Sequence, residues 1–179
     1  MMATGITSGS PSFVRYPRGE GVGVKRKDKP VPLEIGKAEI LREGTTCSIW
    51  AIGDFVQTAL HIADHLLEKY GIKISVVNAR FIKPLDEENL LKHAESHQYI
   101  VTLEDNVLMG GFGSSILEVF EKNNTSVAVK RFGWPDQFIE HGNSVHELRS
   151  KVGLDQESLT KSIEAFILIE DQLSAPIFA

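Results

Sequence analysis

Short apolar segments alternate with amphipathic segments along most of the chain, and this alternation most constrains the fold. The apolar segments cover residues 47–52, 74–77 and 99–103, and another begins at Val127. Between them, apolar residues recur three and four positions apart, which is typical of packed helices. Strands that alternate with helices predict a parallel sheet with helices on both faces, and such strands are apolar nearly throughout. We therefore predict a three-layer α/β domain.

The expected elements also carry start and stop signals. Residues suited to begin helices stand before four amphipathic segments: Asp54, Asp86, Ser144 and Asp155. Ser144 and Glu147 have the spacing of a capping box. Gly71 is suited to end the first long helix, near residue 70. A shorter strand candidate at residues 38–42 precedes the apolar series, and we expect it to be an antiparallel edge strand on a mostly parallel sheet.

Length, charge and cysteine content exclude several classes of protein. The chain has 179 residues, enough for one domain with extensions. Its net charge is −5 with both signs mixed along the sequence, whereas nucleic-acid and membrane surfaces need a basic patch. No apolar run approaches the ~20 residues that span a bilayer. Cys47 is the only cysteine, so an internal disulfide is excluded. We expect a cytoplasmic protein without nucleic-acid or membrane partners, and leave open a targeting sequence upstream.

The amino-terminal part reads as the end of another domain. Residues 12–17 resemble a strand that ends at a proline, and no partner element precedes them. A segment rich in Gly, Lys and Pro follows, which is typical of a linker. We therefore divide the chain into four parts. These are the end of a preceding domain (1–18), a linker (19–35), the α/β domain (36–168) and a tail (169–179).

Two carboxylates and a glycine turn follow the third apolar strand. Glu104 and Asp105 stand at its end, where α/β sheets bind ligands, and residues 110–114 (GGFGS) form the turn. A turn before a helix can bind an anion. This turn lacks the lysine of a P-loop and the third glycine of a dinucleotide fingerprint, so we favour close helix packing. Adjacent strand residues point to opposite faces, so we favour hydrogen bonds between both carboxylates and the loop backbone over acid–base catalysis.

Two pairs of histidines have the spacing of one helical turn. His61 and His65 form the first pair, and His93 and His97 form the second. Such pairs can hold a metal, but the zinc-protease glutamate is absent and no third ligand is evident. We expect all four histidines to be exposed on the polar sides of their helices.

Arg15 and Arg18 flank a Tyr-Pro pair and precede a glycine. Arginine matches the geometry of phosphate oxygens, and glycine lets the backbone approach closely. From these residues alone, a phosphate clamp and a structural ion pair are equally good interpretations.

Several segments together resemble the 1-deoxy-D-xylulose-5-phosphate synthase family. They are residues 13–23 (FVRYPRGEGVG), 79–86 (ARFIKPLD), 101–105 with 110–114 (VTLED and GGFGS), 134–142 (WPDQFIEHG) and 153–155 (GLD). The resemblance covers about residues 13–167. The wider transketolase family shares a looser version of the pattern. Trp134 is a departure, because an aliphatic residue is expected before the Pro-Asp pair.

The resemblance implies a transketolase C-terminal-like fold and a role within a larger enzyme. The family enzyme condenses pyruvate with glyceraldehyde 3-phosphate, using thiamine diphosphate and Mg²⁺, and supplies a precursor for isoprenoid and thiamine synthesis. The resemblance implies that the diphosphate and magnesium sit on an amino-terminal domain, that the glutamate which activates the cofactor sits on a middle domain, and that neither domain is present in this sequence. The resemblance implies that Arg18 binds the aldehyde substrate's phosphate once the middle domain positions it. We expect no catalytic, cofactor or metal residues here, an inactive isolated chain, and a homodimer in the complete enzyme.

Two alternatives stay open from the sequence. The chain could be the C-terminal domain of a transketolase or of a 2-oxo-acid dehydrogenase β-subunit, which substrate turnover by an intact version would distinguish. It could also be a free-standing module that binds an anion at the glycine turn.

Overall fold

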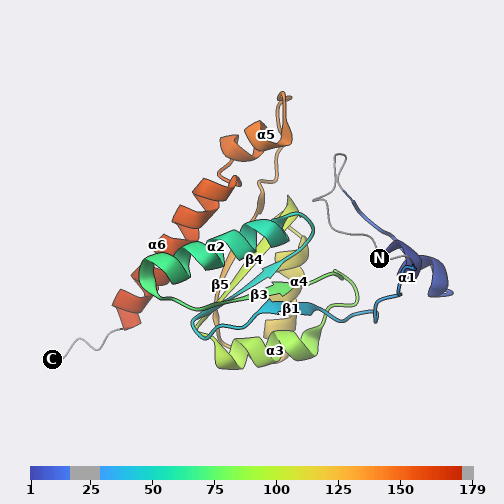
Figure 1. Cartoon of the computed structure of the whole chain (residues 1–179), viewed down its shortest axis with the longest axis horizontal. Coiled ribbons are helices and arrows are strands. Elements are labelled where there is room, and N and C mark those ends of the chain that lie inside the picture. Colours follow the sequence, from blue (N-terminus) through green and yellow to red (C-terminus); the bar gives the residue numbers. More distant parts are fainter. Residues whose placement is uncertain (17–28, 175–179) are drawn as a thin grey trace.

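A five-stranded sheet lies at the centre of the computed structural model, which describes residues 1–16 and 29–174 (Figure 1). Its strands are β1 (Glu39–Arg42), β2 (Cys47–Ala51), β3 (Ile74–Asn78), β4 (Tyr99–Val107) and β5 (Ala128–Trp134). Their order across the sheet is β1-β3-β2-β4-β5. Neighbouring strands run parallel except β1, which pairs antiparallel with β3 at one edge. The predicted parallel sheet with one antiparallel edge strand is confirmed.

Helices cover both faces of this sheet and make the expected three layers. The first face packs α2 (Phe55–Tyr70) and α6 (Gln156–Ser174), and the second packs α3 (Glu87–Ser96) and α4 (Phe112–Lys122). Strand β2 supplies side chains to both cores, because alternate strand residues point to opposite faces. Ile49 lies in the first core and Trp50 in the second, and both are fully buried. Among the described residues, no helix is both long enough and apolar enough to cross a bilayer.

Most of the predicted helix ends are confirmed. The side chains of Asp86, Ser144 and Asp155 each accept a hydrogen bond from a backbone N–H three residues later. Gly71 ends α2 with φ of 70°, in the left-handed region that glycine enters at little cost. Asp54 precedes α2 but makes no capping bond, because its carboxylate pairs with an arginine of α5 (Val145–Lys151) instead.

The amino-terminal segment differs from the predicted strand. Residues 2–7 form a short helix, α1 (Met2–Thr7), and residues 11–16 have no regular structure. An isolated strand is marginally stable without a partner, and these residues pair with no strand. Figure 1 shows α1 outside the three layers. The Thr4 hydroxyl accepts a hydrogen bond from the Leu33 N–H at 2.8 Å, which ties α1 to the chain entering the domain. Helix α6 continues to Ser174, and the four-part division stays a prediction.

Leu66 and Leu67 of α2 offer a direct test of this packing. Leu66 is fully buried, whereas Leu67 is 43% exposed. We expect Leu66→Ala to lower the free energy of unfolding by about 2–5 kcal/mol, because it removes buried methyl groups and leaves a cavity. Leu67→Ala, the matched control, should cost less than about 1 kcal/mol. Urea unfolding measures both, and similar costs for the two would contradict the assigned face of α2.

Candidate functional site

The carboxyl ends of β2 and β4 form the position where open α/β sheets bind ligands. The chain passes from β2 to β3 on one side and reaches β4 on the other, so the strand order reverses there. In such sheets the crevice at this point is the usual ligand site. Asp54 follows β2 and Asp105 lies near the end of β4. Two carboxylates therefore border the crevice.

Arg149 of α5 occupies this crevice. Its Nη2 atom lies 2.9 Å from Asp54 Oδ2 and 3.1 Å from Asp105 Oδ1, so one cation bridges both carboxylates. The guanidinium also stacks over the Phe55 ring, 4.4 Å from its centroid, and the side chain is only 16% exposed. A partly buried cation that contacts two carboxylates and an aromatic face is held in one geometry. The chain's own side chain thus fills the place of a ligand.

Glu104 points to the opposite face of β4 and is buried there. Its carboxylate accepts hydrogen bonds from the backbone N–H groups of Phe112 at 2.7 Å and Gly113 at 2.8 Å, at the start of α4. Burial raises the pKa of this carboxyl, while the two backbone donors and the nearby Arg131 oppose the rise. The predicted bonds to loop backbone are confirmed for Glu104. This prediction is wrong for Asp105, whose partners among the described residues are the side chains of Trp134, Arg149 and Arg15.

The glycine turn serves close packing. A Cβ atom on Gly111 would overlap the Glu104 carboxylate, and one on Gly113 would come within 2.6 Å of Thr102 Oγ1. Glycine therefore lets the start of α4 reach the end of β4. The N–H groups of Phe112 and Gly113 are already paired with a carboxylate of the chain, so they are not presented to an external anion. This arrangement argues against the anion-binding module.

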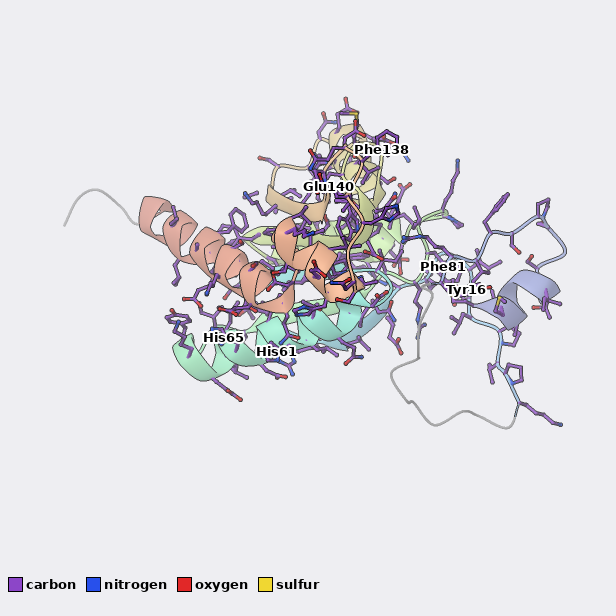
Figure 2. The ribbon with its side chains drawn as sticks, turned by 90° about the horizontal axis from the view of Figure 1, so that it is seen from above. Tyr16, His61, His65, Phe81, Phe138 and Glu140 are labelled. Carbon is purple, nitrogen blue, oxygen red and sulfur yellow. The ribbon has the colours of Figure 1, made fainter. Side chains whose placement is uncertain are left out.

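A pocket of about 490 Å³ opens beside Asp105 at the ends of β4 and β5. It is lined by Arg15, Asp105, Asn106, Val107, Trp134, Pro135, Asp136, Gln137 and Phe138. Phe138 and Glu140 lie on the loop after β5. In Figure 2 they are at the top of the view, whereas His61 and His65 of α2 are at the lower left. Phe138 is fully exposed. The lining of this pocket combines aromatic, acidic and basic side chains. The pocket therefore suits contact with another polypeptide segment better than binding of a single small anion.

His61 and His65 lie on the side of α2 that borders α6. They line a second groove, of about 440 Å³, between α2 and α6. His61 is exposed as predicted, whereas His65 is half-buried and lies 3.0 Å from Glu164 of α6. Glu164 is also bound by Lys69 and Tyr70, and these bonds lower its pKa to about 2. Within residues 1–16 and 29–174, no three His, Cys, Asp or Glu side chains are grouped to hold a metal ion.

The predicted exposure of His93 and His97 is wrong. His93 is buried, and its Nδ1 atom lies 2.7 Å from Ser48 Oγ of β2. Its ring stacks on the half-buried His97 ring at 4.9 Å and meets the edge of Trp50 at 5.8 Å. Burial, with a smaller contribution from His97, lowers the pKa of His93 to about 4. Position 93 lies on the same buried face of α3 as Leu90 and Ala94. The helical spacing of these residues could therefore have predicted that His93 is buried.

Acid should therefore destabilise the fold through His93. The unfolded imidazole has a pKa near 6.5 and the folded one about 4, so the unfolded state binds more protons between these values. This contribution to stability is complete above pH 6.5 and is lost as the pH falls toward 4, by up to about 3 kcal/mol. Unfolding free energies measured by urea across this range should show the loss.

The matched variants separate His93 from the other histidines. His93→Asn keeps a polar partner for Ser48 without titrating, so most of the acid-dependent loss should disappear. His61→Asn, at an exposed position of α2, should leave the pH dependence as in the unchanged chain. Parallel pH curves for His93→Asn and the unchanged chain would refute the assignment.

Glu104 gives a prediction about the glycine turn. Glu104→Ala leaves the N–H groups of Phe112 and Gly113 without their buried acceptor. We expect it to lower the free energy of unfolding by about 2–4 kcal/mol, because each hydrogen bond to a charged group contributes about 1.5–3 kcal/mol. Glu104→Gln keeps one acceptor oxygen and should cost roughly half as much. Calorimetric or urea unfolding measures both, and a neutral Glu104→Ala would contradict the role of this carboxylate.

Of the two arginines singled out in the sequence, one is described. Arg15 Nη2 lies 3.7 Å from Asp105 Oδ2, and its side chain is 69% exposed. This contact agrees with the ion-pair interpretation of Arg15. Arg18 lies outside the described residues, and its role in phosphate binding stays a prediction.

Comparisons with known proteins add the following. The family model described as "Transketolase, C-terminal domain" matches residues 36–159. The chain is 46% identical over 165 residues to "1-deoxy-D-xylulose-5-phosphate synthase 2" of Geobacter sulfurreducens, covering 91% of this chain and 26% of that protein. It is 44% identical over 163 residues to the synthase of Aquifex aeolicus, covering 91% and 26%. The chain thus spans about a quarter of these relatives.

A solved structure is similar as well. It is described as "Split gene transketolase, inactive beta4 tetramer" and aligns with a TM-score of 0.67 at 30% identity. The alignment covers 77% of this chain and 44% of that chain. The matched family region begins at the predicted start of the α/β domain, at residue 36.

Proposed function

Because this chain belongs to the transketolase C-terminal domain family, we propose that it acts as the C-terminal domain of a 1-deoxy-D-xylulose-5-phosphate synthase. The complete enzyme would condense pyruvate with glyceraldehyde 3-phosphate and release carbon dioxide. The observation that carries the proposal is 46% identity to the Geobacter synthase across 91% of this chain. The split-gene transketolase is only 30% identical over 77% of the chain. This lower identity favours the synthase over a transketolase.

Thiamine diphosphate and Mg²⁺ would be held by other domains of that enzyme. The described residues do not fit these groups. Arg149 fills the crevice at the carboxyl ends of the strands, and Glu104 pairs the N–H groups at the start of α4. Held by those other domains, the cofactor would supply the electron-sink chemistry of the complete enzyme. This chain would contribute a rigid domain beside that chemistry.

Arg18 would be this chain's contact with substrate. A guanidinium matches phosphate geometry, and glyceraldehyde 3-phosphate carries a phosphate whereas pyruvate carries none. We place Arg18 in this role from its match to the synthase motif. The same proposal includes a homodimer and a cytoplasmic enzyme. The exposed side chain of Phe138, which lines the pocket beside Asp105, would be available for contacts with other domains or with a second copy.

A chimeric enzyme tests the proposal. The chain replaces the matching quarter of the Geobacter sulfurreducens synthase, and condensation is assayed with pyruvate and glyceraldehyde 3-phosphate. We expect an active enzyme, because the domain surfaces should be compatible at this identity. A chimera that folds and binds thiamine diphosphate but shows no condensation would contradict the proposal.

Arg18→Ala in the chimera then tests the phosphate contact. A charged hydrogen bond is worth about 1.5–3 kcal/mol, so use of the aldehyde phosphate should weaken about ten- to a hundredfold. Pyruvate activation should change far less. An equal loss for both substrates would identify a structural arginine.

A further inference from the structure

Residues 135–151, here called the strap, lie at the surface of the domain. They comprise the loop after β5 and the helix α5, and none of them is buried. In Figure 1, α5 and this loop stand away from the three layers. The chain on either side of the strap is fixed, because Trp134 is bonded to Asp105 and Leu154 is buried in the first core. The strap is therefore a surface segment between two anchored points.

Arg149 makes the strap's polar contacts with the body of the domain. In the part of the chain that the structure describes, the hydrogen bonds and ion pairs that link the strap to earlier residues all come from this side chain. Its guanidinium contacts Asp54 and Asp105 and stacks on the Phe55 ring. One cation thus fastens the strap over the crevice at the carboxyl ends of β2 and β4.

Helix α5 depends on this attachment to stay folded. It has seven residues, and isolated helices shorter than about 12–15 residues are marginal in water. Its other hydrogen bonds are local, such as the bond from the Glu147 N–H to the Ser144 side chain. Gly153, with φ of 71°, separates α5 from the buried Leu154. Segments without buried contacts open at free energies well below that of global unfolding.

We propose that Arg149 is a releasable latch: the strap opens by local unfolding while the sheet stays folded, and its release exposes a site for an arginine side chain of another polypeptide. The site consists of Asp54, Asp105 and the buried Phe55 ring. Two carboxylates beside an aromatic face suit a planar cation and repel anions such as a diphosphate. The latch concerns this chain alone and does not depend on the proposed function.

The geometry of Arg149 shows how such an arginine would bind. Its Nη2 atom lies 2.9 Å from Asp54 Oδ2 and 3.1 Å from Asp105 Oδ1. Closing the strap also orders a segment that buries no side chain of its own, and this entropy cost offsets part of the gain from these contacts. An arginine on a rigid element of a partner makes the same contacts without ordering the strap. A partner's arginine can therefore compete with Arg149 for the site.

Native-state hydrogen exchange of the 179-residue chain, followed by nuclear magnetic resonance, tests the opening. The reporters are the backbone N–H groups of Leu148 and Val152, which are bonded to carbonyls of α5 and its cap. We expect them to exchange much faster than Val101 of β4 and with little dependence on urea, because local opening exposes little surface. If the reporters match Val101 in rate and in urea dependence, the strap opens only with the whole domain, which overturns the proposal.

Variants identify the latch. Arg149→Ala should speed exchange at the reporters about ten- to a hundredfold, the effect of losing a charge-assisted hydrogen bond. Asp54→Asn, which leaves the sequence of the strap unchanged, should act in the same direction. Lys151→Ala is the matched control, because this cation of α5 pairs with Glu147 of the same helix, and its effect should stay within about twofold. Equal effects of Arg149→Ala and Lys151→Ala would contradict a latch at Arg149.

N-acetyl-arginine amide, which mimics an arginine within a polypeptide, probes the exposed site in the Arg149→Ala chain. We expect saturable shifts of the backbone amide signals of Asp54, Phe55 and Asp105. N-acetyl-lysine amide, which lacks the planar fork, should bind more weakly. The unchanged chain should respond less because Arg149 occupies the site, and the double variant Arg149→Ala with Asp54→Asn should lose most of the response. No saturable shift in Arg149→Ala, or an undiminished one in the double variant, overturns the arginine site.

Discussion

A buried carboxylate joins the central strand β4 to the helix that follows it, and the arrangement of the carboxyl end depends on this contact. Glu104 receives the first free N–H groups of α4, which carry the positive end of the helix dipole. The glycine turn can close only because Gly111 and Gly113 leave room for the carboxylate and for Thr102. Gly133 of β5 also approaches the Glu104 side chain. One anion therefore fixes β4, α4 and β5 relative to one another.

The neighbouring residue on β4 faces the other way and organises a different set of contacts. Asp105 and Asp54 hold Arg149 in the crevice that open α/β sheets commonly reserve for ligands. The ligand position at the crevice and the anion position at the start of α4 are thus both satisfied by internal charges. The second oxygen of Asp105 faces outward, toward the pocket and Arg15. This supports a role for the domain in holding other parts of an enzyme.

The architecture could be predicted from the sequence because its signals are local. Apolar strands, helical spacing and the caps at Asp86, Ser144 and Asp155 all report on neighbouring residues, and the structure confirms them. The errors concern contacts between distant segments. Asp54 looked like a cap until Arg149, 95 residues later, was seen to bind it. His93 of α3 was predicted to be exposed although it shares the buried face of Leu90 and Ala94, and its partner Ser48 lies on β2, 45 residues away. Pairings across the fold depend on tertiary geometry that short patterns do not encode.

The edge strand β1 bears on how copies of this protein can assemble. It is only four residues long, its register with β3 shifts between Ile40 and Arg42, and its charged ends pair with Arg80 and Asp64. Short, irregular and charged edges resist the addition of another strand. Growth of a continuous sheet from one molecule to the next is therefore discouraged at this edge. These features keep a newly made domain from forming intermolecular β-structure along β1, and leave the helices, the carboxyl-end loops and the other edge strand, β5, as surfaces for assembly.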